Sequence, residues 1–341
     1  DEAVAALWRP FQASVAADPA LRADYASVAA EHGRAQTQKA LAAALNRRTE
    51  FVLADEAGVV EASVPPFSAL WPELADLAAP ADALRGDAAR QRWLAWAAEL
   101  GRESGKTAPK AADAVADAWT LDDAEARLRV LRKAFFVADE DRLTKHLQKF
   151  PAAQAAEAEL QRLCQATRQN AAWQHQQRMA RLTRCLLLEY GMLKRARGWV
   201  DMNDIERAAQ VLLADPVLSG WVQERLDARI KHLLIDEFQD TNPLQWQALH
   251  AWLSGYTGAG AAPGVFIVGD PKQSIYRFRR AEPQVFKAAQ AFIRDGLGGD
   301  LLACDHTRRN APAVIGAVNA VMLQAQEEGA WNGYRSHTTE S

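Results

Sequence analysis

Two short apolar runs, each closed by an acidic residue, constrain the fold of this chain more than any other feature. The first run is His232–Asp236 and the second is Val265–Asp270. Between them, Asn242 and Pro243 form a strong helix start, because Asn caps helices and Pro is favoured at the first helical position. A strand, a helix and a second apolar strand in this order are typical of a parallel sheet. The segment therefore predicts an α/β domain.

The first two hundred residues predict helices instead. Alanine is abundant, and apolar residues recur at three- and four-residue spacing, as in 91–100. Prolines interrupt the pattern near 58–82. Pro151 then opens a long helical pattern that runs to about Arg197, where Gly198 is a natural stop. At ~1.5 Å per residue this helix would reach roughly 70 Å, and we expect a break within it.

Beyond this helix the pattern changes to shorter elements. Asp201 or Asn203 can cap a short helix that ends at 215–216, where Pro follows Asp. A third strand is expected at Leu301–Cys304, and another helix near 311–326.

Composition excludes some classes of protein. Hydrophobic residues make up 49% and charged residues 24%, as in ordinary globular proteins. The formal net charge of -3 means that any DNA contact must come from a local group of cations and aromatics. No apolar run approaches the ~20 residues of a membrane span, and the start lacks a signal-peptide pattern. We expect a cytoplasmic protein that does not contact a membrane.

The three cysteines lie far apart and form no CxxC pair. This spacing favours buried thiols in a reducing compartment over a disulfide framework. The seven histidines are scattered as well, so we expect no structural zinc site.

The segment Leu233–Asn242 carries the strongest chemical signal. An apolar strand that ends in Asp236 and Glu237 places two carboxylates at the carboxyl edge of a parallel sheet, where ligands bind in such folds. One carboxylate can hold Mg²⁺ through water, and the other can orient or deprotonate an attacking water. By themselves, two acids after a strand are equally compatible with an edge that has no chemical role.

The full string DEFQDTN, residues 236–242, resembles the second motif of UvrD/RecB-family DNA helicases residue for residue. The resemblance implies ATP and Mg²⁺ as cofactors. It also implies that Asp236 positions the metal through water, that Glu237 is the catalytic base, and that Gln239 contributes to cofactor binding.

A second segment, Val268–Arg279, resembles the third motif of the same family. The resemblance implies that Gln273 contacts the γ-phosphate as part of the catalytic set. It further implies that Tyr276 and Phe278 stack on single-stranded DNA bases and that Arg279 contacts DNA. Base–aromatic stacking is worth about 1–3 kcal/mol per base and tolerates any sequence. The alternative is that the two aromatics belong to the protein core.

A third segment, Thr307–Asn319, resembles the fourth motif. The resemblance places Arg309 on the catalytic arginine that reaches the γ-phosphate in the manner of an arginine finger. Thr307 stands where Asn is usual, and Asn310 where Ser is usual. Arg308 takes the place of the aromatic that stacks on adenine, and a guanidinium can also lie flat on a base. The alternative is two arginines on a solvated helix start.

A weaker match, Tyr190–Ile205, resembles the stretch that precedes the second motif through Tyr190, Lys194 and 200–205, and we interpret its role as structural. Gly101–Thr107 looks like a phosphate-binding P-loop. However, three residues rather than four separate its glycines, and a helical pattern precedes it. We expect no phosphate binding there, and we expect Lys106 to be a surface cation.

A group of cations recurs on the long helical pattern and could follow a DNA duplex, although a solvated helix face is the favoured interpretation. Its members are Arg178, Arg181, Arg184, Lys194, Arg195 and Arg197.

The third motif is more similar to the AddA and RecB branch of the family than to UvrD. UvrD-type proteins favour an acid at the place of Lys272, Trp at Phe278 and Gly at Arg280. The resemblance implies an incomplete RecA-like P-loop NTPase domain with a parallel sheet, a large helical insertion and the start of a second RecA-like domain. The implied boundaries are 1–198 for the insertion, 199–299 for the first RecA-like domain and 300–341 for the second.

The first, fifth and sixth motifs of the family do not occur in these residues, so we interpret the chain as an internal piece of a longer protein. The implied parent is an ATP-dependent 3′–5′ DNA helicase or translocase of recombinational repair. It would act on single-stranded DNA or DNA ends, and a second component of a helicase–nuclease is a candidate partner. Two alternatives stay open: a non-catalytic DNA-binding paralogue, and the helicase part of a helicase–nuclease. We expect the isolated chain to hydrolyse ATP negligibly.

Overall fold

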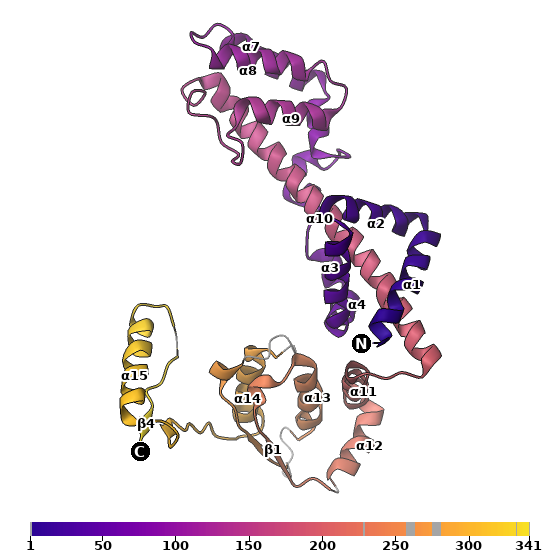
Figure 1. The fold of residues 1–341 in the computed structure, drawn as a ribbon, viewed down its shortest axis with the longest axis vertical. Coiled ribbons are helices and arrows are strands. Elements are labelled where there is room, and N and C mark those ends of the chain that lie inside the picture. The colour runs from indigo at the N-terminus through magenta and orange to yellow at the C-terminus, as the bar shows by residue number, and fades with distance from the viewer. Residues whose placement is uncertain (1, 228, 257–262, 275–280, 332, 341) are drawn as a thin grey trace. The chain divides into compact units, whose positions relative to one another are not determined.

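The computed structural model describes residues 2–227, 229–256, 263–274, 281–331 and 333–340. The chain divides into two compact units, Asp1–Trp199 and Val200–Ser341, which are described separately below. Figure 1 shows helices throughout the first unit and a mixture of helices and short strands in the second. Within the described residues, no helix combines the length and apolar character needed to cross a membrane.

The first unit is helical, as the sequence pattern predicts. Its short elements between 58 and 84 coincide with the proline-rich stretch. The elements are α1 (Glu2–Ala17), α2 (Pro19–His32), α3 (Arg34–Asn46), α4 (Arg48–Glu56), α5 (Val59–Ala62), α6 (Phe67–Leu70), η1 (Pro72–Leu74), η2 (Pro80–Leu84), α7 (Asp87–Leu100), α8 (Thr107–Ala118), α9 (Ala124–Phe135) and α10 (Pro151–Arg197).

Helix α10 is continuous over 47 residues, so the expected break inside it is wrong. After Pro151 the helix contains no proline, and its Ala, Leu, Gln and Arg residues are strong helix formers. Gly198 ends the helix in the left-handed conformation with φ 64°, as predicted.

Two hydrophobic cores are built around this one helix, and Figure 1 shows other helices packed along both of its halves. The N-terminal part, including Leu160 and Leu163, joins the core formed by α7, α8 and α9. The C-terminal part, including Leu182 and Leu186, joins the core formed by α1, α2 and α3. Packing at both ends explains why the helix continues through the stretch between them.

The stretch between the two cores is polar and holds the proline-rich segment through glutamines. Gln169 donates a hydrogen bond to the carbonyl of Pro65 at 2.6 Å. Gln176 donates to the carbonyl of Val60 at 3.2 Å. These side chains bind backbone carbonyls of the segment, and the Val60 carbonyl also accepts from the hydroxyl of Ser63 at 2.8 Å.

Two of the α10 arginines are held in ion pairs within the unit. Arg181 donates two hydrogen bonds to Asp24 at 2.7 and 2.9 Å, and Arg184 donates two to Asp55 at 2.8 and 2.6 Å. The Arg184 hydrogen bond lowers the pKa of Asp55. Arg181 and Arg184 therefore join α10 to acids of α2 and α4.

The cysteines follow the prediction in part. Burial raises the pKa of the Cys164 thiol to about 11, which makes it an inert core residue. Cys304 is exposed, contrary to the expectation of burial.

The second unit combines helices with two small parallel sheets. Its elements are α11 (Met202–Ala214), α12 (Pro216–Asp227), β1 (His232–Ile235), η3 (Phe238–Asp240), α13 (Pro243–Ser254), β2 (Gly264–Ile267), η4 (Pro271–Gln273), α14 (Pro283–Gly296), β3 (His306–Thr307), α15 (Pro312–Glu327) and β4 (Thr338–Thr339).

The predicted strand–helix–strand unit is confirmed: β1 pairs with β2 in parallel, with Leu233 opposite Val265 and Ile235 opposite Ile267. These residues face the cores that α13 and α14 help to form. The alternate residues face outwards, and Leu234 is 73% exposed. The described residues therefore cover one face of this sheet.

The helix starts in this unit form at the predicted caps. Asp201 caps α11 through a capping box with Asp204, and Asn242 caps α13 through a capping box with Gln245. Asn242 and Gln245 both donate to Glu206 of α11, at 3.0 and 2.8 Å. The caps thus tie the segment before the DEFQDTN string to the string itself.

The strand expected at Leu301–Cys304 is wrong. No described strand pairs with that segment, and Leu302 is 81% exposed. The strand forms slightly later, as β3, and pairs in parallel with β4 through His306 and Thr338. The expected helix near 311–326 is confirmed as α15.

Candidate functional site

The acids of the DEFQDTN string lie at the carboxyl edge of the β1–β2 sheet. Asp236 follows β1, and the amide of Val268, just after β2, donates to the carbonyl of Ile235 at 2.8 Å. The amide of Phe238 then donates to the carbonyl of Val268 at 2.9 Å. Asp236 and Glu237 are both exposed at this edge. The two carboxylates are therefore accessible to a ligand.

Gln239 connects the two strand ends from below this surface. The residue is 3% exposed. Its side-chain amide donates to the carboxylate of Glu237 at 2.5 Å, and its side-chain oxygen accepts from the amide of Asp270 at 3.0 Å. The backbone carbonyl of Gln239 also accepts from the hydroxyl of Ser274 at 3.1 Å. These bonds fix the orientation of the Glu237 carboxylate relative to β2.

Gly269 makes the Gln239 bridge sterically feasible. A Cβ atom at this position would lie 2.5 Å from the side-chain oxygen of Gln239 and 2.7 Å from the ring of Phe286. The backbone of the second acidic run can approach Gln239 this closely only because the residue has no side chain.

Glu237 has a positive φ of 50°, and no other described residue besides glycines has one. For a non-glycine residue this left-handed conformation costs of order 1–3 kcal/mol, and such residues cluster at functional sites. The amide of Glu237 donates to the carboxylate of Asp236 at 2.8 Å. The sharp turn at Glu237 leads the chain back into the protein, where Phe238 and Gln239 are buried, and leaves the side chains of Asp236 and Glu237 exposed.

Gln273 lies at the same edge, in η4. Its side-chain amide donates to the carboxylate of Asp270 at 3.2 Å, and its backbone amide donates to the carbonyl of Asp270 at 2.9 Å. Gln273 is exposed. The structure thus brings Asp236, Glu237 and Gln273 to one edge, as the sequence predicts. Their chemical roles stay predictions.

The DNA-contact predictions for Tyr276, Phe278 and Arg279 concern residues outside those that the structure describes.

Arg308 and Arg309 lie after β3, on the second small sheet, and both are exposed. The hydroxyl of Thr307 accepts from the amide of Arg309 at 3.2 Å, a local side-chain bond in the turn after β3. Among the described residues, no hydrogen bond or ion pair joins either arginine to the β1–β2 edge. The γ-phosphate contact implied for Arg309 stays a prediction.

The P-loop-like segment lies between two helices. Gly101 follows α7, and Thr107 begins α8, so no strand precedes the segment. Lys106 is exposed. The expected helical context and the surface position of Lys106 are confirmed.

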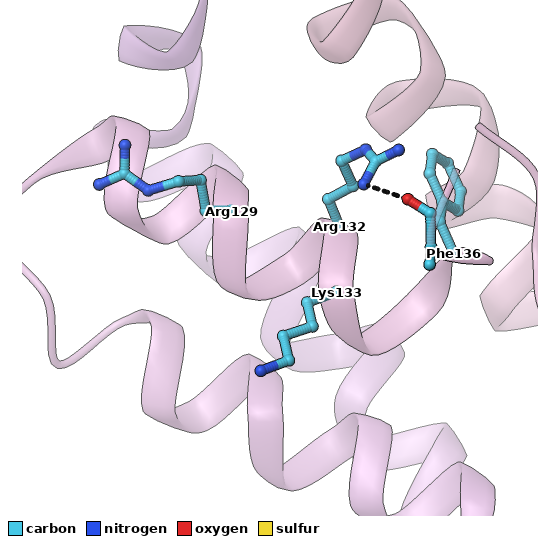
Figure 2. A pocket seen from close by; sticks show the side chains of 5 residues that line it. Arg129, Arg132, Lys133 and Phe136 are labelled. Atoms are coloured by element: carbon cyan, nitrogen blue, oxygen red, sulfur yellow. Dashed lines mark hydrogen bonds between the residues drawn. The ribbon is translucent and has the colours of Figure 1, made fainter. Parts of the chain in front are cut away.

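A cavity of about 420 Å³ lies beside α9 in the first unit and is lined by Arg129, Arg132, Lys133, Phe136 and Ala138. Figure 2 shows Arg129, Arg132 and Lys133 pointing in different directions from α9. Arg132 donates a hydrogen bond to the carbonyl of Ala138 at 3.1 Å. Acids already pair with two of these cations, since Arg132 contacts Asp141 at 3.3 Å and Arg129 contacts Asp123 at 3.7 Å. None of the motif residues lines this cavity.

The sequence does not reveal the bridging role of Gln239 or the need for Gly269. Both follow from the approach of two strand ends that are separated by about thirty residues. One sequence signal was available. Gly269 and Asp270 end the second apolar run as Asp236 and Glu237 end the first, which indicates that the two strand ends lie at the same sheet edge.

Comparisons with known proteins show which family the chain resembles. A family model described as the UvrD/REP helicase N-terminal domain matches residues 83–293. Several bacterial proteins that are named as components of an ATP-dependent helicase/nuclease align with parts of the chain. The relative from Listeria monocytogenes is 36% identical over 138 residues, which is 40% of this chain and 11% of the relative. The relative from Pelotomaculum thermopropionicum is 37% identical over 153 residues, which is 43% of this chain and 12% of the relative.

The chain thus spans about a tenth of the length of the curated relatives it matches. The family match, in contrast, covers more than half of the 341 residues and includes both β1 and β2. This chain therefore belongs to the UvrD/REP helicase family.

Proposed function

We propose that the complete protein is an ATP-dependent DNA helicase or translocase that moves 3′ to 5′ on single-stranded DNA during recombinational repair. The observation that carries the proposal is the β1–β2 edge, where Gln239 holds an exposed, strained Glu237 beside Asp236 and Asp270. Two oriented carboxylates at the carboxyl edge of a parallel sheet suit a metal–nucleotide site.

The residues present fit Mg²⁺·ATP in part. Asp236 offers an exposed carboxylate, the ligand type that Mg²⁺ prefers, and would hold the ion through water. The bound ion would neutralise phosphate charge. Lys106 and its neighbours do not form a P-loop, so another part of the parent would have to cradle the phosphates.

In this scheme each residue has one task. Glu237 accepts a proton from the attacking water. Gln273 and Arg309 contact the γ-phosphate, and Arg309 does so once the second RecA-like domain closes on the first. Gln239 contributes to cofactor binding, as predicted, and also positions Glu237. Arg308 stacks on the adenine ring of the nucleotide.

We further propose that Tyr276 and Phe278 stack on DNA bases and that Arg279 contacts the backbone. Opening and closing of the nucleotide cleft would then advance the strand. This assignment rests on the motif resemblance. Tyr276→Ala in the complete protein should weaken single-stranded DNA binding and the stimulation of ATP hydrolysis by DNA.

The test of the nucleotide site is Glu237→Gln in the complete protein. We expect DNA-stimulated ATP hydrolysis to fall by about 100-fold or more, with ATP binding retained. Glu224→Gln, at an exposed position on α12, is the matched control and should hydrolyse ATP at the wild-type rate. Wild-type hydrolysis by Glu237→Gln would refute the general-base role. An inactive wild-type protein that still binds DNA would instead favour the non-catalytic paralogue.

A second candidate is the helicase part of a helicase–nuclease that works with a partner chain. The names of the relatives favour it, because they describe components of a helicase/nuclease. In that case a metal-dependent nuclease activity should survive Glu237→Gln in the complete protein, while strand separation is lost. Absence of nuclease activity from the wild-type protein, with and without a partner, would argue against it.

A further inference from the structure

Three potential metal ligands from distant parts of the sequence meet where α2 ends against the middle of α10. They are Glu31, His32 and His175. One ligand atom from each lies within 4.8 Å of the other two. This cluster is in the first unit, apart from the nucleotide motifs, and the histidine spacing in the sequence does not reveal it.

The packing of α2 on α10 explains why these residues meet. Asp24 pairs with Arg181 through two hydrogen bonds, which fixes the register of the two helices. Moving seven residues along α2 covers about 10.5 Å and leads to Glu31, and moving six residues back along α10 covers about 9 Å and leads to His175. The two helices therefore run in opposite directions along their contact.

The two imidazoles are in contact and oriented. The ring centroids of His32 and His175 are 4.8 Å apart, at an interplanar angle of 82°. A ring nitrogen of His32 lies 3.6 Å from the carboxylate of Glu31. Two neutral imidazoles and one carboxylate form a ligand set that suits zinc and similar divalent transition metals.

An independent observation points to a ligand at this place. The Nδ1 atom of His175 is buried and has no hydrogen-bond partner. A buried polar nitrogen without a partner is unfavourable, so a ring in this state needs a compensating interaction. Coordination of a cation by Nδ1 itself provides one.

We propose that Glu31, His32 and His175 bind one zinc-class divalent cation, which fastens the end of α2 to α10. Tetrahedral zinc with Zn–N distances of about 2.0–2.1 Å places its ligand atoms about 3.3 Å apart. The present spacing of up to 4.8 Å closes to that value by rotation of side chains, since Glu31 and His32 are about half exposed. Three protein ligands leave the fourth position to water.

The test is Zn²⁺ binding to the purified 341-residue chain, measured by competition with a chromogenic chelator. We expect one Zn²⁺ per chain with a dissociation constant in the micromolar range or below. His32→Ala and Glu31→Gln alter exposed side chains, so the fold should survive both. Each should weaken binding by about tenfold or more, as loss of a ligand does. His175→Ala should do the same.

His146→Ala is the matched control, because His146 is exposed and lies outside the cluster. Its binding should equal that of the wild type. A second readout is thermal unfolding, because Zn²⁺ bound to the folded state alone raises the midpoint of the wild type and not of His32→Ala. Equal Zn²⁺ binding by wild type and the His32→Ala/His175→Ala double variant, or no binding by the wild type, would overturn the proposal.

Discussion

The side-chain amide of Gln239 donates a hydrogen bond to the carboxylate of Glu237 at 2.5 Å. The donor is buried and the acceptor is exposed. A buried residue thus determines where an exposed carboxylate points. The orientation of Glu237 at the sheet edge therefore depends on Gln239, which need not contact a ligand itself.

Gln239→Leu keeps the approximate volume but removes both hydrogen-bonding groups. The amide of Asp270 then loses its partner, so we expect the free energy of unfolding to fall by about 1–3 kcal/mol. In the complete protein, ATP hydrolysis should fall more than ATP binding, because Glu237 is no longer oriented. Urea unfolding of the 341-residue chain and steady-state kinetics of the complete protein measure the two effects. Unchanged kcat would contradict the positioning role.

Gly269→Ala introduces a methyl group 2.5 Å from the Gln239 oxygen and 2.7 Å from the ring of Phe286. Overpacking of this kind costs about 1–3 kcal/mol, and we expect a corresponding loss in the free energy of unfolding. Gly316→Ala is the matched control, since a Cβ there meets nothing within 4 Å and the residue lies inside α15. That change should stabilise the helix by up to about 1 kcal/mol. Equal effects of the two substitutions would show that the close approach is unimportant.

The ion pair between Asp24 and Arg181 predicts unequal effects of removing its two members. The Asp24 side chain is 9% exposed and that of Arg181 is 46% exposed. Arg181→Ala leaves a buried carboxylate unpaired and should cost about 1–3 kcal/mol in the free energy of unfolding. Asp24→Ala leaves an arginine that water can reach and should cost less. A larger loss for Asp24→Ala, measured by urea unfolding, would contradict this interpretation.

Acid should weaken the first unit through Asp141. Its hydrogen bond with Arg168, together with Arg132, lowers the pKa of Asp141 below the ordinary value of 3.8. The unfolded chain therefore binds the proton more readily than the folded one. The ionised Asp141 carboxylate therefore stabilises the folded state fully above pH 3.8. This stabilisation is lost as the pH falls through the lower, folded-state pKa.

Asp141→Asn lacks this titration. The variant should be less stable than the wild type at neutral pH, and the difference should shrink as the pH falls below 3.8. Urea unfolding of both proteins between neutral pH and about pH 2.5 measures it. A constant difference over that range would show that Asp141 does not contribute through its charge.

The isolated chain should hydrolyse ATP negligibly. Its only P-loop-like segment, Gly101–Thr107, has the wrong spacing and lies between two helices. Phosphate release from the purified chain, with and without single-stranded DNA, should not exceed that of its Glu237→Gln variant. Robust hydrolysis stimulated by DNA would refute this expectation.

Local signals in the sequence predicted the elements well. Caps and stops at Asp201, Asn242 and Gly198 formed as expected, because a cap depends on residues a few positions away. The strand expected at Leu301–Cys304 failed, since a strand also needs a hydrogen-bonded neighbour, and the chain offers one to His306–Thr307 instead.

The candidate site was predictable only where the chain is contiguous. Asp236 and Glu237 could be placed at a sheet edge because they follow an apolar run. The interaction of Gln239 with Asp270 depends on how closely two strand ends approach, and no local pattern reports that distance. For the same reason the pairs Asp24–Arg181 and His32–His175 could not be predicted from the sequence.

Helix α10 contributes to both cores of the first unit without interruption. A displacement of either core is therefore transmitted to the other through one uninterrupted helix of about 70 Å, which contains no hinge. We therefore expect the two cores of the first unit to move together as one rigid body, and we expect any hinge motion to occur outside α10.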